Sequence, residues 1–560
     1  MGIKSDDSRR FEIKDEKIIC SPLEFVPEPG GLGYEYFMAM KKHKNKVAQY
    51  ILESGEEDTY GSLLQRSVRT ALKLKSKGYD KDDIMCLCSN NHINSVVPFL
   101  AASYLTMKVC SLDPSLSQAD VTHLIRLVKP SIFFVIEKSK QMIQNALTEI
   151  GIDAEIVVYN DATFDEYLEE SEEEESFEPS LASSLHDTAV IIFSSGTTGM
   201  PKGICQSHYA IIAQSVNMLY LFNDIKDTDG IQDFYFSNNN TVTSVTLLYS
   251  SLYWISAILF FTAAVLSGTS RVVCSAFDPK QFWQILDKYK VSLTFLAPNQ
   301  GIDILKVGRP DNIDTSQLNI LVIGGATISQ HFLKELREVL PGTFVCQGYG
   351  QTEVAGVLTC FRSNSVQDTL GLHYKPDSCG RPVPGVAYKI VDPETEQLCG
   401  PNERGELRVK TKFVMNGYYN MDSSESFDSE GWLKTGDVVY FDEELFFYIV
   451  DRIKDMLKYR SWHVPPAVLE KVLTQHPAVH RAVVIGLPHE EDGDHPMGVV
   501  VKNADFPDVS AKDIEDFVNE RVDDRHQLRG GVKLVDEIPL TPSGKIRRSY
   551  IKKLVLDGKI

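Results

Sequence analysis

The sequence predicts an α/β fold with a β-barrel-like segment, divided into a large N-terminal domain and a small α+β C-terminal lid. The first two-thirds of the chain alternates short apolar runs with amphipathic helical patterns, which is typical of α/β proteins. After about residue 375, apolar and polar residues alternate as they do in antiparallel strands. Because 560 residues exceed one ordinary hydrophobic core, two or more domains are expected.

Apolar runs of strand length appear throughout the N-terminal region. Between them lie segments with apolar residues at helical spacing, such as residues 62–78 and 329–340. The runs that predict strands are Ile84–Ser89, Ser131–Ile136, Glu155–Tyr159, Ala189–Phe193, Leu293–Ala297 and Ile320–Ile323.

The polar segment that starts at Asp451 is the expected domain boundary. Before it, residues 384–392, 404–413 and 446–452 predict antiparallel strands. We expect an N-terminal domain over 1–450, a hinge segment over 451–458 and a lid over 459–560, with a binding site in the cleft between the domains. The lid's predicted helices are Pro466–Gln475 and Ala511–Arg521, and its predicted strands are Ala482–Gly486 and Val532–Leu534.

Two segments of unusual composition allow other interpretations. Val245–Leu266 carries no charge and approaches the ~20 residues of a membrane span. Its first part is rich in Ser and Tyr, and it lies between globular-looking segments, so it predicts a buried strand-to-helix element and no transmembrane span. The acidic tract Asp165–Pro179 predicts a solvated loop without an assigned function.

The formal net charge of −20 argues against nucleic acid or an anionic membrane as the main partner. Ten scattered cysteines without a C-x-x-C spacing predict free thiols in a reducing compartment, and the thirteen histidines show no zinc spacing. The first residues lack the apolar core of a signal peptide, and the last five, LDGKI, lack a peroxisomal S-K-L type ending. The default expectation is therefore a cytoplasmic protein.

Residues 194–203 read SSGTTGMPKG and follow the β-branched run AVIIF directly. Glycines and small hydroxyl residues let backbone N–H groups approach a phosphate closely, and Lys202 adds a mobile positive charge. The spacing is not that of a Walker A loop. The segment therefore predicts a phosphate-binding loop for a nucleotide.

A series of motifs follows this loop in a fixed order. With that series the chain resembles the adenylate-forming superfamily of acyl-CoA synthetases, 4-coumarate:CoA ligases, beetle luciferases and peptide-synthetase adenylation domains. The resemblance extends from roughly residue 45 to 553 and is closest to the luciferase-like acyl-CoA ligase branch. The motifs are Gly324-Gly-Ala326, Gly348-Tyr-Gly-Gln-Thr-Glu353, Gly405-Glu-Leu407, Gly417-Tyr418, Trp432-Leu-Lys-Thr-Gly-Asp437, Asp451-Arg452 and Pro542-Ser-Gly-Lys545.

The resemblance implies that a carboxylate attacks the α-phosphate of ATP and expels pyrophosphate, a reaction that needs positioning and electrostatic stabilisation. It implies Lys545, Thr352 and Lys202 as catalytic residues, and Glu353 as a ligand of Mg²⁺. The implied ATP and AMP site consists of Ser194, Ser195, Gly196, Thr197, Thr198, Gly199, Lys202, Gly324, Gly325, Ala326, Gly348, Tyr349, Gly350, Thr352, Asp437 and Arg452.

Within that set the resemblance gives individual roles. The small residues Gly324–Ala326 leave room for the flat adenine, and Tyr349 stacks on it. Asp437 accepts hydrogen bonds from the ribose hydroxyls, and Arg452 assists at the sugar and phosphate.

The second half-reaction of the family uses coenzyme A and a swing of the lid. By resemblance the hinge falls at Lys454, and coenzyme A passes Lys458 and Ser461. Ser461 stands where related ligases carry a glycine, and its side chain can narrow the path of the thiol.

The residues placed at the acid pocket are Tyr249, Ser251, Tyr253, Trp254 and Gly350, with Leu252 beside them. Their aromatic wall suits an apolar acid, although the side chains can equally be ordinary core. Ser251 stands where luciferases carry a histidine, which weakens a prediction of light emission.

The function predicted from these features is an ATP-dependent acid:CoA ligase acting on a medium- or long-chain fatty acid, with ATP, Mg²⁺ and coenzyme A. The alternatives are a luciferase-type monooxygenase, a 4-coumarate-like ligase of aromatic acids and a non-catalytic acyl- or nucleotide-binding protein. Expected partners are a small carboxylic acid and coenzyme A. The resemblance leaves a peroxisomal location open.

Overall fold

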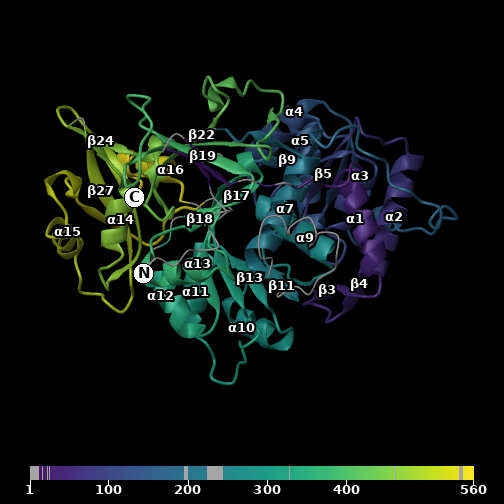
Figure 1. Ribbon diagram of the computed structural model, residues 1–560, viewed down its shortest axis with the longest axis horizontal. Helices are drawn as coiled ribbons and strands as arrows, with labels where there is room; N and C mark the ends of the chain where they lie inside the picture. Colours follow the sequence, from purple (N-terminus) through teal and green to yellow (C-terminus); the bar gives the residue numbers. More distant parts are fainter. Residues whose placement is uncertain are drawn as a thin grey trace.

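The computed structural model confirms the predicted α/β fold, with a large N-terminal domain and a small C-terminal domain at one end of the molecule (Figure 1). Helices α1, α2 and α3 lie at the opposite end from the C-terminal domain (Figure 1). The structure describes residues 12–14, 17–21, 23, 25–194, 200–223, 244–326, 328, 330–460, 462–540 and 546–560.

Two seven-stranded, mostly parallel sheets form the centre of the N-terminal domain. The first sheet has the order β21 (Gly417–Tyr418), β10 (Gly203–Ser207), β9 (Thr188–Phe193), β6 (Lys108–Ser111), β5 (Ile84–Cys88), β7 (Ile132–Val135) and β8 (Glu155–Val158). The second has the order β15 (Phe344–Gln347), β14 (Ile320–Ile323), β13 (Leu293–Leu296), β11 (Val245–Leu248), β12 (Ser270–Val273), β3 (Val47–Ile51) and β4 (Glu57–Thr59).

Helices α7 (His208–Phe222) and α9 (Ile255–Ser267) pack against each other in the core between these sheets. Every residue of α7 is buried, as expected for a helix covered on all sides. The other α-helices among the described residues of the N-terminal domain are α1 (Leu32–His43), α2 (Tyr60–Ser76), α3 (Val97–Tyr104), α4 (Gln118–Val128), α5 (Glu137–Ile150), α6 (Ala162–Asp165), α10 (Pro279–Lys288), α11 (Pro298–Val307), α12 (Gln330–Val339) and α13 (Val366–Tyr374).

The predicted β-barrel-like segment is an antiparallel sheet of six strands, and the described strands do not close it into a barrel. A three-stranded sheet of β16 (Tyr349–Gln351), β17 (Gly356–Cys360) and β18 (Arg381–Pro382) also belongs to the N-terminal domain. The six strands are, in spatial order, β1 (Glu12–Lys14), β2 (Ile18–Ser21), β19 (Val386–Val391), β20 (Gly405–Thr411), β22 (Leu433–Phe441) and β23 (Phe447–Arg452).

The lid is a five-stranded sheet with helices α14 (Pro466–Leu473), α15 (Ala511–Asn519) and α16 (Arg548–Leu556). The four elements that the sequence predicts here are all present within a few residues of their expected ends. The hairpin partner of β26 was not predicted, nor were the two short strands before α14. The strands are β25 (Trp462–Val464), β24 (Leu457–Tyr459), β27 (Gly493–Lys502), β26 (Val479–His489) and β28 (Val532–Val535).

The uncharged segment Val245–Leu266 forms strand β11, a turn and most of helix α9, as its pattern predicts. Among the described residues, no helix is both long and apolar enough to cross a membrane.

The acidic tract Asp165–Pro179 is more than a solvated loop, because it is ion-paired to helix α2. The Arg69 guanidinium lies 2.7 Å from the Glu174 carboxylate, and both side chains are less than one-fifth exposed. Phe177 of the same tract is buried against Phe37 of α1, with ring centroids 5.8 Å apart. The tract therefore covers the outer surface of the N-terminal helices.

Asp451 connects the last core strand to the first helix of the lid. Strand β23 ends at Arg452 and the lid strand β24 begins at Leu457. The exact domain limits given above stay a prediction. The Asp451 Oδ2 atom accepts the backbone N–H of Ala467 in α14 at 2.9 Å. Burial raises the pKa of Asp451 to about 6, although the charge of Arg548 and the hydrogen bond from Ala467 oppose the rise.

This raised pKa predicts how Asp451→Asn changes stability with pH. The folded state favours the protonated carboxyl, so wild-type stability falls as pH rises from about 4 to about 6 and stays lowered above that. The variant lacks this loss and gains up to about 3 kcal/mol over the wild type at pH 7 relative to pH 4, at about 1.4 kcal/mol per unit of pKa. Urea unfolding of both proteins at several pH values, followed by the fluorescence of the four tryptophans, measures the difference. A difference that does not change with pH would contradict the prediction.

Candidate active site

A cavity of about 920 Å³ lies where the two sheets, the β16–β17 hairpin and the start of the lid meet. Most of the predicted site residues that the structure describes line it. They are Ser194, Lys202, Tyr249, Tyr253, Trp254, Gly324, Gly325, Gly348, Tyr349, Gly350, Thr352, Glu353, Arg452 and Lys454.

The predicted phosphate loop connects β9 to β10, which pair antiparallel. Its two ends are closed by a pair of hydrogen bonds, from the Ser194 N–H to the Lys202 carbonyl and from the Lys202 N–H to Ser194 Oγ, both at 2.9 Å. The predicted nucleotide-binding residues Ser195, Gly196, Thr197, Thr198 and Gly199 lie outside the described residues. The hairpin therefore fixes both ends of the loop at the cavity wall.

Lys202 lies near the residues that are expected to bind the phosphates and Mg²⁺. Its Nζ is 4.5 Å from the centre of the Tyr418 ring, and the Tyr418 hydroxyl donates to Glu353 Oε1 at 3.4 Å. Burial and the nearby Glu353 raise the pKa of Tyr418, so it remains a hydrogen-bond donor. Thr352 and Glu353 form a 3-10 turn directly after β16. One ammonium, one carboxylate and two hydroxyls thus share one end of the cavity, and the carboxylate oxygens of Glu353 suit Mg²⁺.

The predicted adenine wall follows β14. Gly325 has φ +101°, a conformation that side chains rarely adopt, and a Cβ added to Gly324 would lie 3.0 Å from the Phe295 ring. Ala326 is exposed and does not line the cavity. Two of the three small residues are therefore required by the backbone shape and by close packing.

Asp437 is buried behind the cavity wall and does not itself line it. Its Oδ2 accepts the Tyr349 hydroxyl and the Gln351 side-chain amide, each at 2.6 Å. Arg452, its cross-strand neighbour in the β22–β23 pair, approaches Oδ1 to 3.4 Å. Gln351 was not among the predicted site residues, although it lies inside the quoted Gly348–Glu353 motif. The Tyr349 ring lines the cavity, while burial and Asp437 hold the pKa of its hydroxyl well above the ordinary value.

The acid end of the cavity is mostly apolar and aromatic. Tyr253 and Trp254 line it with ring centroids 6.0 Å apart, and Tyr249 lines it while its ring packs edge-on against Phe277 at 4.9 Å. The wall also includes residues that sequence reasoning did not identify, because only the packing of α7 and α9 brings them together. These are Met218, Phe222, Leu259, Phe260, Phe295 and Val357.

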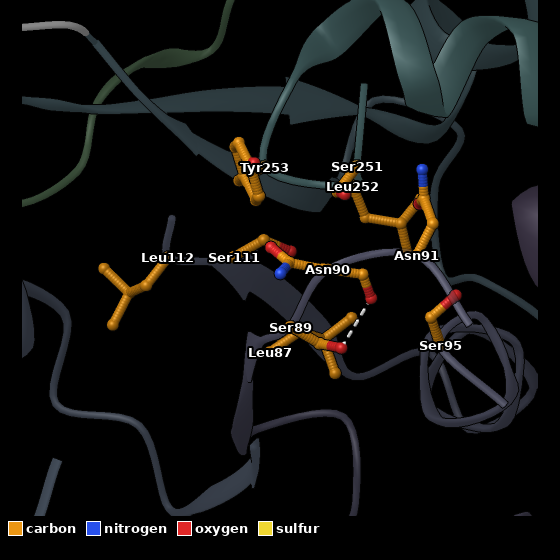
Figure 2. Close-up of a pocket in the computed structure, with 10 residues that line it drawn as sticks. All are labelled: Leu87, Ser89, Asn90, Asn91, Ser95, Ser111, Leu112, Ser251, Leu252 and Tyr253. Carbon is orange, nitrogen blue, oxygen red and sulfur yellow. Dashed lines mark hydrogen bonds between the residues drawn. The ribbon is translucent and has the colours of Figure 1, made fainter. Parts of the chain in front are cut away.

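Ser251 does not reach this cavity. It is 4% exposed and borders a separate cavity of about 10 Å³, opposite the Ser89–Asn90 turn and Ser111 (Figure 2). Its neighbour Leu252 also borders the small cavity, and the Ser251 carbonyl accepts the Trp254 N–H at 2.9 Å. Ser251 therefore does not line the large cavity, whereas Trp254 does and Tyr253 borders both cavities. The place of Ser251 in the acid pocket stays a prediction.

The lid meets the core beside the cavity. Lys454, the predicted hinge, is exposed and lines the cavity, whereas Lys458 is exposed outside its lining. Lys471 of α14 forms an ion pair with Asp377 of the core at 2.9 Å. The predicted catalytic Lys545 and the predicted path residue Ser461 lie outside the described residues.

Comparison with known proteins agrees with this arrangement. Residues 37–419 match the family model of AMP-binding enzymes, and residues 468–545 match the model of the AMP-binding enzyme C-terminal domain. The chain belongs to the AMP-binding enzyme family. This membership confirms the predicted adenylate-forming superfamily.

Among curated relatives, a luciferin 4-monooxygenase of Photuris pensylvanica is 30% identical over 97% of this chain and 98% of its own length. A probable CoA ligase of Humulus lupulus is 30% identical over 98% of both chains. Relatives of the second kind agree with the predicted class of AMP-forming acid–thiol ligases.

Among solved structures, a luciferase-like enzyme of the nonluminescent mealworm Zophobas morio is 34% identical, with a TM-score of 0.71 over 78% of this chain and 99% of that one. ATP-bound MatB of Rhodopseudomonas palustris is 19% identical, with a TM-score of 0.81 over 94% of this chain and 100% of that one, and supports the fold alone.

The Asp437 contacts predict the effect of Tyr349→Phe on nucleotide binding. The change keeps the ring but removes the hydroxyl that holds the carboxylate at 2.6 Å. We expect the dissociation constant for AMP to rise roughly tenfold, since a hydrogen bond to a charged group is worth about 1.5 kcal/mol. Calorimetric titration measures it. The matched control is Tyr448→Phe, which removes a hydroxyl from Asp442 in the same sheet at 3.0 Å, and an equal loss there would refute the proposed positioning.

The backbone at Gly350 predicts a stability effect. A Cβ at this position would lie 2.0 Å from the Gly356 carbonyl oxygen, so Gly350→Ala forces the β16–β17 hairpin apart. We expect a loss of about 1–3 kcal/mol, measured as a lower thermal midpoint. Gly400→Ala is the control, because its Cβ would meet only Glu403 Oε2 at 3.6 Å. Equal midpoints for the two variants would show that the hairpin tolerates the methyl group.

Proposed function

We propose that the protein is an ATP-dependent acid:CoA ligase that converts a carboxylic acid to its acyl-AMP and transfers the acyl group to coenzyme A. The observation that supports this proposal most directly is that charged residues line one side of the cavity and uncharged residues line the other. Lys202, Glu353 and Arg452 line one side, whereas the residues from α7 and α9 on the other side are uncharged. Such a cavity suits a molecule that is anionic at one end and apolar at the other.

In the proposed first step, a carboxylate oxygen attacks the α-phosphorus of ATP. A bond from the acyl oxygen to phosphorus forms, and the bond to the leaving pyrophosphate breaks. Lys202 and Thr352 both line the cavity. Lys202 would stabilise the negative charge that develops on pyrophosphate, and Thr352 would hold the α-phosphate. Asp437 would accept hydrogen bonds from the ribose hydroxyls, which requires its carboxylate, now behind the cavity wall and held by Tyr349, to become accessible when the nucleotide binds. Lys545 would bridge the two reacting anions.

Mg²⁺ bound with ATP would neutralise phosphate charge, and Glu353 is the residue proposed to hold it. A solved neighbour, MenE of Bacillus subtilis, is described as a complex with ATP and magnesium ion.

In the proposed second step, the coenzyme A thiolate attacks the acyl carbon and AMP leaves. The lid would swing about Lys454, which lies in the 3-10 turn Ile453–Asp455 between the last core strand and the first lid strand. A turn that carries few backbone hydrogen bonds is a suitable hinge, because it can absorb a dihedral change without breaking a sheet. The thiol would pass Lys458 and Ser461.

The proposed acid is a medium- or long-chain fatty acid. Support comes from the flexible apolar side chains Met218 and Leu259 beside the aromatic ones, since methionine adapts to alkyl chains. Aromatic acids remain the competing substrate class, because Tyr253, Trp254 and Phe260 can pack against a ring.

A luciferase-type monooxygenase is a second candidate, favoured by the luciferin 4-monooxygenase relatives. The 34% identical luciferase-like structure comes from a nonluminescent animal, which favours the ligase. For the compartment we propose the cytoplasm, with the peroxisome as the alternative, because one relative is the peroxisomal OPC-8:0-CoA ligase 1 of Arabidopsis thaliana.

Acid-dependent release of pyrophosphate from MgATP tests this proposal. We expect turnover with fatty acids that requires coenzyme A for the thioester product and falls at least 100-fold in Lys545→Ala, because the reacting anions lose their bridging charge. Lys553→Ala, on the helix that follows, is the control and should keep wild-type turnover.

The same assay identifies the acceptor of the acyl group and the class of acid that the enzyme uses. Pyrophosphate release without acyl-CoA formation in the presence of coenzyme A would refute the thiol transfer. Acyl-CoA formation that appears in Ser461→Gly would locate the obstruction at that side chain. Greater turnover with 4-coumarate than with fatty acids would show that the substrate is an aromatic acid. Light emission with luciferin would support the luciferase-type monooxygenase. If the protein binds AMP but releases no pyrophosphate from MgATP with any acid tested, the proposed enzymatic activity would be refuted.

A further inference from the structure

The hairpin tip that joins β26 and β27 carries His489, Asp492 and His495 at intervals of three residues. Strand pairing places His489 opposite Gly493 and Leu487 opposite His495, so all three side chains lie at the same end of the hairpin. Their exposed fractions are 42%, 13% and 20%, which leaves them accessible to a small ion. The family motifs and the proposed reaction use none of them.

The nitrogen and oxygen atoms of this group converge. Asp492 Oδ2 lies 2.8 Å from His495 Nε2 and 3.5 Å from His489 Nδ1, and the ligand atoms all lie within 4.8 Å of one another. The two imidazoles stack with centroids 3.9 Å apart and planes 14° apart. Within the described part of the chain, no other cluster of three or more His, Cys, Asp or Glu side chains meets this distance criterion.

We propose that His489, Asp492 and His495 form a binding site for one Zn²⁺ or a similar divalent transition metal. Bonds of about 2.0–2.2 Å in a tetrahedral site place neighbouring ligand atoms about 3.3–3.5 Å apart. The two separations from Asp492 bracket this value. His489 Nδ1 accepts the Asp492 backbone N–H at 3.2 Å, so metal binding exchanges this hydrogen bond for a bond to the ion as the partly exposed imidazole rotates. Two nitrogen ligands and one carboxylate select Zn²⁺ over Mg²⁺ or Ca²⁺, which prefer oxygen, and leave one position for water.

Arg460 orients the carboxylate of this site. Its Nε donates to Asp492 Oδ1 at 2.6 Å, which leaves Oδ2 facing both imidazoles. Such hydrogen bonds from outside the ligand set hold a metal ligand in position. The Arg460 backbone N–H also donates to the Asp492 carbonyl at 2.8 Å, and the Lys458 N–H donates to Asp494 Oδ2 at 3.1 Å. The hairpin tip is therefore attached to the lid segment that precedes Ser461.

This attachment gives the metal site a regulatory role, which rests on the proposed function. Metal bound to Asp492 fixes Arg460 and, through it, the segment of the predicted coenzyme A path. Zinc therefore changes the rate of thioester formation and leaves acid-dependent adenylation unchanged, because none of His489, Asp492 and His495 lines the cavity.

Zinc binding is tested on the untagged full-length chain after chelator treatment, by calorimetric titration with Zn²⁺ and by the visible absorption of added Co²⁺. We expect one site per chain that weakens roughly tenfold or more in His489→Gln and in His495→Gln. The matched control is His526→Gln, which removes a histidine 2.7 Å from Asp523 in the same lid and should bind like the wild type.

Absence of zinc binding in the wild type, or equal binding by all four proteins, would overturn the site. This measurement needs no substrate, so its result is independent of the proposed ligase activity. The coupling is tested by the rate of thioester formation from preformed acyl-AMP with and without Zn²⁺. A zinc effect present in the wild type and absent in His489→Gln supports the coupling, and stoichiometric binding without such an effect would overturn it.

Discussion

The buried carboxylate of Asp437 is the constraint on which the candidate active site depends. It accepts hydrogen bonds from Tyr349 and Gln351 of strand β16 and lies beside Arg452 at the end of β23. These contacts connect the small three-stranded sheet to strands β22 and β23 of the antiparallel sheet, and β23 leads into the lid. A buried charge is tolerated only where such partners surround it, so the carboxylate holds the two sheets in one arrangement.

The packing of two sheets over α7 and α9 explains why the cavity is polar at one end and apolar at the other. The polar groups come from loops at strand ends, where backbone N–H groups and glycines are available. Many of the apolar groups come from α7, which is wholly buried, and from α9, most of which is buried. The nucleotide and the apolar acid proposed above could therefore share one cavity without a charge being buried among these helices.

The lid is joined to the core through polar contacts that are modest and local. Asp451 reaches α14, Lys471 pairs with Asp377 while both remain about two-fifths exposed, and Lys454 lies in the turn between the two sheets. Exposed ion pairs contribute little free energy, which is compatible with the lid rotation proposed above. The lid's own core, by contrast, is closed by buried residues such as Leu469, Val484 and Ile514.

The sequence by itself determined the α/β class, the strand-to-helix segment at Val245–Leu266 and the loops at Ser194, Gly324 and Gly348, because periodicity and glycine placement are local properties of a chain. It could not show that Ser251 borders a separate small cavity, that Gln351 donates to Asp437 or that Met218 and Phe260 line the same cavity. Those outcomes depend on the direction of one turn and on contacts between residues far apart in the chain. Only tertiary packing decides them, since side chains that never neighbour one another in sequence must share the same space.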